Sequence, residues 1–375
     1  MSIGMEKGSG WQWLLPSVIP GVALVVVPAF ASPFLGAKTA CLLIAGAFAV
    51  FACLGGKIPG ESTMLRGDVL SKFFSKSLYW SAGFWAVAIM ASALRAHNWA
   101  ESWRVLAPCA AAALLLIAFI RRRIAAEVIV VAIAMSAVAV AAFAISGRFG
   151  YDLPHLFAGV AAPGRMRAAS TLGNPLFVAS FLSCAIWAVL ALPLRWVWRF
   201  MAALVIVGGM AATTERTALF AFAAGAIVFA LSGGAAFRQR ALVLTLLLLL
   251  AGWYAFGRVG NPRSPAVAAQ GRVFLWKHAL RHTTLLGSGP GSFYRVYNKN
   301  LREAAAEIPP SQFHFINYET DSYNIFVQEL VEDGWLSLAA MLAFFAAWFR
   351  LAWRASRNLG GGCALAGVAA FLASG

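Results

Sequence analysis

The stretch IAAEVIVVAIAMSAVAVAAFAI, residues 124–145, decides the fold class of this chain. Its 22 residues include a single charged side chain, Glu127. At about 1.5 Å rise per residue, a helix of this length spans roughly 33 Å, enough to cross a hydrocarbon core of about 30 Å. Backbone polar groups inside a bilayer must pair within their own segment, so we expect an α-helix here.

Similar apolar runs follow one another along the 375 residues, of which 61% are hydrophobic and 12% charged. Soluble domains carry about 25% charged residues, so this composition excludes a soluble globule. We predict an all-α, polytopic membrane bundle of about 11–12 transmembrane helices. The spans read from the sequence are 13–30, 37–54, 78–94, 106–120, 124–145, 176–192, 196–212, 217–231, 241–256, 325–349 and 363–373.

The predicted spans divide the chain into three parts. Residues 1–256 form an N-terminal transmembrane bundle of about nine spans. Residues 257–324 form a long loop that contains an amphipathic helix, and residues 325–375 form C-terminal transmembrane helices. Pro-interrupted residues 13–30 resemble a cleavable signal peptide, but their full-span length favours a retained first helix.

Lys and Arg in the short loops predict the orientation, because they favour the cytoplasmic side. Fifteen of them fall on one side of the membrane and seven on the other. This places the N-terminus in the cytoplasm and the long loop outside. The net charge of +16 then reflects cytoplasmic flanks that meet anionic membrane lipids, and no nucleic-acid binding is expected.

Two polar segments precede the long loop. In RAASTLGNPLFVASFL, residues 167–182, Asn174 followed by Pro175 is typical of a helix start. We expect Asn174 to cap a helix at the membrane interface, with a cleft-lining role as the alternative. In TTERTALFAF, residues 213–222, Arg216 lies on a very tight connection near a helix N-terminus. It either snorkels to lipid headgroups or holds an anion.

The loop itself contains GRVFLWKHALRHTTLLGSGPGSF, residues 271–293, which gathers cations in an otherwise apolar chain. At 100° per residue, one predicted face holds Leu275, Trp276, Ala279 and Leu280, and the opposite side holds Lys277, His278 and Arg281. Arg272 falls in the middle of the apolar face. An inward arginine near a helix N-terminus favours an anion such as phosphate, although a salt bridge to a loop acid is the alternative.

Two further patterns in this region are weaker. His278 and His282 are four residues apart, but no third ligand is evident and no metal is expected. The run GSGPGSF, residues 287–293, predicts a tight turn whose backbone amides can approach a ligand.

The last polar segment, INYETDSYNIFVQELVEDGWLSL, covers residues 316–338. Asn324, Gln328 and Glu332 recur every four residues and so share one helical stripe, which suggests a water-filled cleft. Glu319 and Asp321 before this helix are either N-terminal charge caps or carboxylates that take a proton from an acceptor hydroxyl.

Four of these segments, residues 167–182, 213–222, 271–293 and 316–338, follow one another as in the O-antigen ligase and O-antigen polymerase superfamily. The chain resembles that superfamily over roughly residues 167–345. The resemblance implies a GT-C-like membrane glycosyltransferase that needs neither metal nor other cofactor. The implied donor is a glycan on undecaprenyl diphosphate, and the implied acceptor hydroxyl belongs to lipid A core or a similar glycan. The implied setting is the periplasmic face of the bacterial inner membrane. Arginines that match Arg216 and Arg272 hold the donor diphosphate, with Lys277 and Arg281 as further candidate cations.

One departure from the family pattern concerns the acceptor side. Ligases of this family place a histidine where this chain has Tyr323, and tyrosine, with a pKa of about 10, is a poor base at neutral pH. Asp321, Glu319 or His314 then becomes the candidate base. The departure leaves a chain-elongating polymerase as the main alternative. A small-anion transporter of the bicarbonate type and a non-catalytic envelope component are the others.

Overall fold

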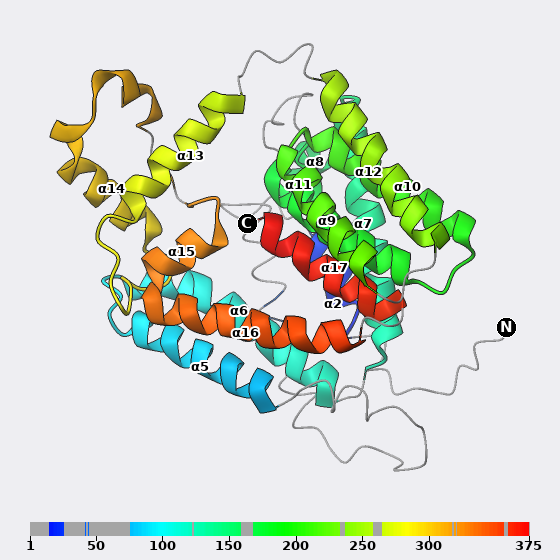
Figure 1. The fold of residues 1–375 in the computed structure, drawn as a ribbon, viewed down its shortest axis with the longest axis horizontal. Helices are drawn as coiled ribbons and strands as arrows, with labels where there is room; N and C mark the ends of the chain where they lie inside the picture. Colours follow the sequence, from blue (N-terminus) through cyan, green and yellow to red (C-terminus); the bar gives the residue numbers. More distant parts are fainter. Residues whose placement is uncertain are drawn as a thin grey trace. The chain divides into compact units, whose positions relative to one another are not determined.

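The computed structural model describes residues 15–25, 42, 44, 76–121, 124–158, 168–232, 237–257, 265–316, 319, 321–355 and 359–374 (Figure 1). Every regular element in these ranges is a helix, which confirms the all-α prediction. The α-helices are α2 (Val18–Leu24), α5 (Lys76–Ala93), α6 (Trp99–Arg121), α7 (Ala126–Arg148), α8 (Leu153–Ala158), α9 (Pro175–Ala191), α10 (Trp196–Thr213), α11 (Arg216–Leu231), α12 (Phe237–Gly257), α13 (Pro265–Ala279), α14 (Phe293–Glu303), α15 (Ile325–Glu332), α16 (Gly334–Ala355) and α17 (Leu359–Ser374). Three 3₁₀ turns are η1 (Ser170–Leu172), η3 (Ala305–Glu307) and η4 (Pro310–Phe315).

Four of the described helices are long and apolar enough to cross a membrane: Trp99–Phe119, Ala126–Arg148, Trp196–Thr213 and Gly334–Arg354. Four shorter apolar helices accompany them, at Pro175–Ala191, Arg216–Leu231, Gln239–Trp253 and Gly361–Ser374. These features support a helical membrane protein. The predicted span 37–54 lies outside the described residues except for positions 42 and 44, and span 13–30 is described only in part.

The prediction of one continuous span over residues 325–349 is wrong. The chain breaks at Asp333 and Gly334, so that α15 ends at Glu332 and the apolar span begins at Gly334. Gly334 has φ +83°, a left-handed conformation that an α-helix does not accommodate. Apolar residues continue on both sides of the break, which is why the sequence pattern concealed it.

The described chain forms two compact units. Unit 1 combines residues 1–70, 108–259 and 352–374, and unit 2 combines residues 71–107 and 260–351. The described residues 76–107, which the sequence pattern grouped with the N-terminal bundle, therefore cluster with the long loop and with most of α16.

The core of unit 1 packs large aromatic rings against small residues. Trp187 of α9 is fully buried, with its ring 5.6 Å from that of Phe222 and 5.4 Å from that of Phe229, both on α11. The ring lies directly over Gly225: a Cβ added there would be 2.7 Å from Trp187 Cζ2. Small residues at such crossings let membrane helices approach closely and gain van der Waals contact.

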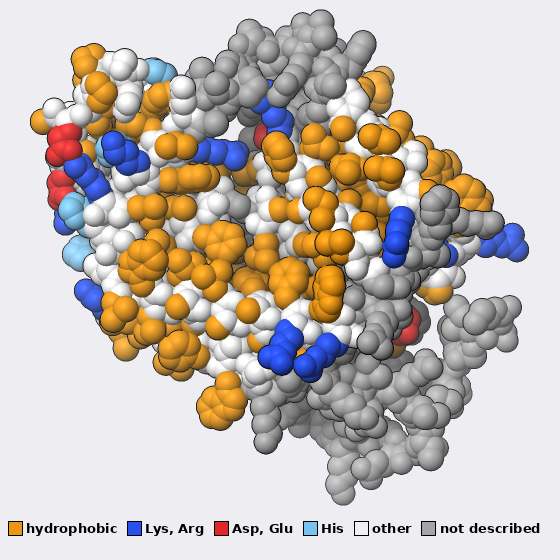
Figure 2. All heavy atoms as spheres, in the orientation of Figure 1, with side chains coloured by type: hydrophobic (Ala, Val, Ile, Leu, Met, Phe, Trp, Pro, Cys, Tyr) orange, Lys and Arg blue, Asp and Glu red, His pale blue; other side chains and the backbone are white. Residues whose placement is uncertain are grey.

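Unit 2 has its own core, built from α13, α14 and α15. Phe274, Leu275 and Val331 are buried there together with Phe293 and Tyr297, whose stacked rings are 6.0 Å apart. Figure 2 shows acidic and histidine side chains gathered along α14 and the chain beside it, whereas large apolar side chains remain exposed on α5 and α16. This unit therefore combines a polar surface with apolar helices suited to lipid.

We predict that Gly225→Ala destabilises unit 1, because the new methyl group must displace the buried Trp187 ring. Overpacking of this kind costs about 1–3 kcal/mol, and thermal unfolding in detergent measures it as a lower Tm. Gly252→Ala in α12 is the matched control, since nothing lies within 4 Å of its added Cβ. The control is expected to be neutral or stabilising, by up to about 1 kcal/mol. Equal effects of the two substitutions would contradict the packing described here.

Candidate functional site

The glycine-rich turn of unit 2 (residues 284–292) is bound to the junction between α15 and α16 (residues 332–336). The backbone amides of Ser288 and Gly289 both donate to the carbonyl oxygen of Glu332, each at 2.8 Å. In the other direction, the Trp335 amide donates to the carbonyl of Thr284 at 3.2 Å. Two sequence motifs almost 50 residues apart thus form one backbone hydrogen-bonded structure.

The side chain of Glu332 completes this arrangement. It is only 6% exposed, and its carboxylate accepts hydrogen bonds from the backbone amides of Gly291 at 2.8 Å and Phe293 at 3.1 Å. The side-chain amide of Gln328 also donates to it, at 2.5 Å. A buried carboxylate is tolerated when such donors compensate for its lost hydration. Burial raises the pKa of Glu332 to about 7, against the hydrogen bonds from Gly291, Phe293 and Gln328, which lower it. The group that the amides of the turn approach is therefore a carboxyl side chain of this protein.

The predicted stripe of Asn324, Gln328 and Glu332 exists, and its polar atoms take part in internal hydrogen bonds. The Asn324 Oδ1 caps α15 by accepting from the amides of Phe326 and Val327, both at 3.0 Å. The Gln328 side-chain oxygen accepts from the amide of Ser322 at 2.9 Å. Asn324 and Gln328 thus fix the start of α15 and the chain that leads into it.

The contact between turn and junction requires glycine at two facing positions. Gly287 has φ +66°, and a Cβ added there would lie 2.1 Å from the Glu332 carbonyl oxygen. Gly334 faces it, and its added Cβ would lie 2.3 Å from the amide nitrogen of Gly287. Backbone meets backbone here, so no side-chain rotation can relieve the overlap.

We predict that Gly287→Ala severely destabilises unit 2. The left-handed backbone costs about 1–2 kcal/mol with a side chain, and the overlap adds about 1–3 kcal/mol. Gly271→Ala in α13 is the control, because its Cβ would meet only Phe315, at 3.4 Å. Limited proteolysis and thermal unfolding of the two variants measure the difference. A Gly287→Ala protein as resistant as the control would contradict the contact.

The position of Arg272 on α13 differs from the prediction. The buried residues of this helix are Phe274, Leu275, His278 and Ala279. Their face is rotated about the helix axis by roughly 90° from the predicted face. Arg272 is consequently exposed at the edge of this face, and His278 is buried instead of exposed. This side of α13 packs against α14 and α15, and the Phe315 ring of η4 covers it as well, 5.9 Å from the ring of Phe274.

Arg272 nevertheless lies near the predicted acceptor residues. The Tyr323 hydroxyl donates to the Glu319 carboxylate at 2.7 Å, and the charges of Asp321 and Arg272 both act on that hydroxyl. The indole of Trp276 holds this segment against α13 by donating to the Ser322 carbonyl at 2.8 Å. We refer to Arg272, Glu319, Asp321 and Tyr323 as the Tyr323 group. It brings together one candidate phosphate-binding residue and three candidate acceptor residues.

Within the Tyr323 group, tyrosine is not a base at neutral pH. Burial, the hydrogen bond to Glu319 and the charges of Glu319 and Asp321 raise the pKa of Tyr323 to about 12, while Arg272 acts in the opposite direction. The hydroxyl is therefore protonated and acts as a hydrogen-bond donor. Tyr323 also has φ +55°, an uncommon conformation for a residue with a side chain. The carboxylates of Glu319 and Asp321 are the groups able to accept a proton here.

The remaining candidates of unit 2 lie around α13 and η4. Lys277 is exposed, and Arg281 forms an ion pair with Glu307. His314 is exposed on η4, with its ring 3.9 Å from that of Phe315. Arg281 thus already has a carboxylate partner.

Two candidates belong to unit 1. Arg216 is the first residue of α11, directly after the two-residue connection from α10, and it is half-buried. This agrees with the predicted tight turn at a helix N-terminus. Asn174 is the N-cap of α9: its Oδ1 accepts from the Leu176 amide at 2.8 Å, and Pro175 follows in the first turn. The predicted capping role of Asn174 is confirmed.

Sequence reasoning missed contributions of α5 to this region. The indole of Trp85 donates to the Glu329 carboxylate at 2.6 Å, and the Ser92 hydroxyl donates to the Glu332 carbonyl at 2.8 Å. These residues lie in an ordinary apolar run, some 240 positions before their partners. No local pattern could have paired them.

No protein-family model matches this chain, and no curated protein matches its sequence.

We predict that buried His278 makes unit 2 less stable in acid. Burial lowers the pKa of His278 below 6.5, and the charges of Lys277 and Arg281 lower it further. The charge of Glu307 acts in the opposite direction and raises it. The unfolded chain therefore binds this proton more readily, so stability present above pH 6.5 is lost as the pH falls.

Thermal unfolding between pH 7 and pH 5 measures this loss, which is expected to be smaller in His278→Phe than in the unmodified protein. His282→Phe is the control, because that side chain is 62% exposed and lies 3.4 Å from Glu303. If removal of His282 flattened the pH dependence as much as removal of His278, the assignment would be wrong.

Proposed function

We propose that this protein is a membrane glycosyltransferase that moves a glycan from undecaprenyl diphosphate to an acceptor hydroxyl. The observation that carries the proposal is the Tyr323 group, in which an exposed guanidinium lies beside two carboxylates and a protonated tyrosine. A cation to bind a diphosphate and a carboxylate to accept a proton are the two groups that such a transfer needs. The resemblance to the O-antigen ligase and polymerase superfamily supports the same reading.

The proposed chemistry is a single displacement at the anomeric carbon of the donor sugar. The acceptor oxygen forms the new glycosidic bond while the bond from this carbon to the diphosphate oxygen breaks. Negative charge grows on the departing diphosphate, and Arg272 stabilises it. The acceptor proton passes to Asp321, with Glu319 held by the Tyr323 hydroxyl. Such a displacement inverts the anomeric configuration.

The proposed setting is the periplasmic side of a bacterial inner membrane, with the N-terminus in the cytoplasm. The distribution of Lys and Arg among the short loops supports this orientation. The acceptor is proposed to be lipid A core or a similar glycan. The resemblance assigns Arg216 to the donor diphosphate, and its place at the first position of α11 suits an anion-binding role.

We predict that Arg272→Ala lowers glycan transfer about 10²–10³-fold, the usual effect of removing one group that stabilises transition-state charge. Transfer is measured with purified protein in detergent and an undecaprenyl-diphosphate-linked glycan. Arg272→Lys is expected to recover only part of the rate, because an ammonium cannot bind phosphate in a bidentate way. Arg216→Ala tests the second arginine in the same assay. Arg302 is an exposed cation on α14, so Arg302→Ala is the control and is expected to be fully active.

The acceptor side is tested in the same assay. Asp321→Asn is expected to abolish transfer, whereas Tyr323→Phe should retain most of it because the tyrosine does not ionise at neutral pH. A product with one added glycan block identifies a ligase, and a ladder of repeats identifies a polymerase. Full transfer by Arg272→Ala would refute the proposal. Flux of a small anion in liposomes without any lipid-linked sugar would favour the transporter instead.

A further inference from the structure

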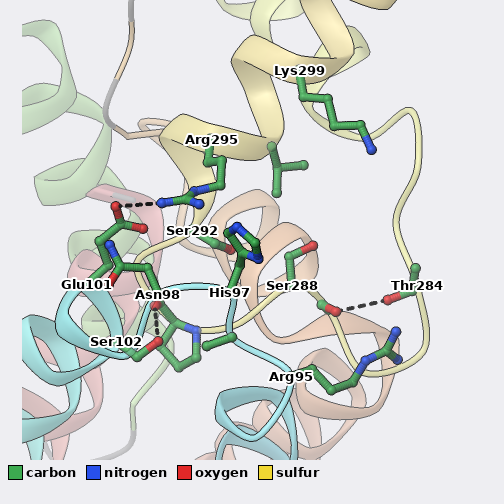
Figure 3. Close-up of a pocket in the computed structure, with 14 residues that line it drawn as sticks. Arg95, His97, Asn98, Glu101, Ser102, Thr284, Ser288, Ser292, Arg295 and Lys299 are labelled. Atoms are coloured by element: carbon green, nitrogen blue, oxygen red, sulfur yellow. Dashed lines mark hydrogen bonds and ion pairs between the residues drawn. The ribbon is translucent and has the colours of Figure 1, made fainter.

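A polar cavity of unit 2 is lined by none of the residues of the Tyr323 group. It has a volume of about 450 Å³ and is lined by residues 95–98, the first turn of α6, the glycine-rich turn and the first half of α14. Figure 3 shows Lys299 above the space and Arg95 below it, with His97, Ser288 and Ser292 between them. Binding pockets for small molecules have volumes of about 300–1,000 Å³, so this cavity suits a ligand about the size of a monosaccharide.

The charges around the cavity favour an anion. Three cations line it, Arg95, Arg295 and Lys299, whereas Glu101 is the one carboxylate among the lining residues. Arg295 pairs with Glu101 at 3.1 Å, and Lys299 is 3.8 Å from Glu303 on its outer side. Among the described residues, Arg95 has no carboxylate partner within ion-pair distance. The cavity thus retains a positive excess that the protein itself does not neutralise.

Ser292 supplies an independent sign of a missing partner. Its side chain is 8% exposed and lines the cavity, yet its hydroxyl has no hydrogen-bond partner among the described residues. Leaving a buried hydroxyl unpaired costs about 1–3 kcal/mol. The hydroxyl oxygen itself is enclosed. A rotation about the Cα–Cβ bond that turns it into the cavity would let it donate a hydrogen bond to an oxyanion there and remove this cost.

The wall that carries Ser292 is held in place by the protein. The Ser102 hydroxyl donates to the Pro290 carbonyl at 2.9 Å, and the Gly291 amide donates to the Glu332 carboxylate at 2.8 Å (Figure 3 shows the serine). Gly289 lies so close to Ala96 that a Cβ added to it would be 2.5 Å from the alanine Cβ. The cavity is therefore formed before any ligand arrives, which lowers the entropic cost of binding.

We propose that this cavity binds an oxyanion carried by a sugar-sized polar molecule, with Arg95 and the Ser292 hydroxyl as its principal contacts. The guanidinium of Arg95 can bind two oxygens of a phosphate or carboxylate at once. His97, Asn98 and Ser288 offer hydrogen-bonding groups for sugar hydroxyls. The same oxyanion chemistry has two sources, a soluble sugar phosphate and the headgroup of an anionic lipid. The inference does not rest on glycan transfer.

Calorimetric titration of the purified full chain in neutral detergent tests the site, with glucose 6-phosphate as the probe and glucose as its uncharged counterpart. Glucose 6-phosphate is expected to bind and glucose to bind far more weakly. Arg95→Gln should weaken binding about tenfold or more, since it removes a charge-assisted contact. Ser292→Ala should weaken it several-fold without loss of Tm, because the hydroxyl makes no internal hydrogen bond. Arg302→Gln removes a cation from α14 that does not line the cavity and should change nothing.

A second experiment, with lipids as probes, identifies the source of the oxyanion. Protein incubated with phosphatidylglycerol or phosphatidylcholine is analysed by mass spectrometry for retained lipid. Retention of phosphatidylglycerol that Arg95→Gln abolishes, together with no binding of glucose 6-phosphate, supports the site and assigns it to a lipid headgroup. The proposal is overturned if neither probe binds, or if Arg302→Gln weakens binding as much as Arg95→Gln does. Because binding alone is measured, an inactive transferase leaves this result unaffected.

Discussion

The structure of unit 2 depends on one residue, Glu332, which ends α15 and holds the glycine-rich turn from two directions. Its carbonyl accepts two backbone amides of the turn, and its carboxylate accepts one amide from the turn, Gly291, and one from Phe293 at the start of α14. Four hydrogen bonds to one buried residue are possible only because Gly287 and Gly334 bring the two backbones into contact. Hydrogen bonds to a buried carboxylate are stronger than those between neutral groups, so this arrangement fixes the turn firmly.

Both polar sites of unit 2 follow from that contact. On one side, Gln328 links Glu332 to Ser322 and so positions the chain that carries Asp321 and Tyr323. On the other side, the turn presents Ser292 to the cavity beside Arg95. The gathering of polar residues in an otherwise apolar chain thus has a structural cause. The glycines of the motif allow two backbone segments to pack against each other. Arg272 lies at the edge of the buried face of α13, and Arg95 lines the cavity.

The helices could be predicted from the sequence, because runs of apolar residues and capping signals such as Asn174-Pro175 are local. The break at Gly334 was missed because apolar runs on both sides suggested one span, although Glu332-Asp333-Gly334 carries two acids and a glycine, a local turn signal. The rotation of α13 was missed for a similar reason. Its periodicity allows several buried faces, and packing against α14, α15 and Phe315 selects one of them. The cavity joins residues near 95 and 292, a pairing that no single stretch of sequence reveals.

The left-handed glycine at the start of α16 has a mechanical consequence. A membrane helix normally ends in a loop that can move independently of it. Here the first residue of the apolar span is in backbone contact with the turn, so a tilt or rotation of α16 would carry the turn and its serine along. A force that acts on α16 would therefore reach the turn directly through this backbone contact.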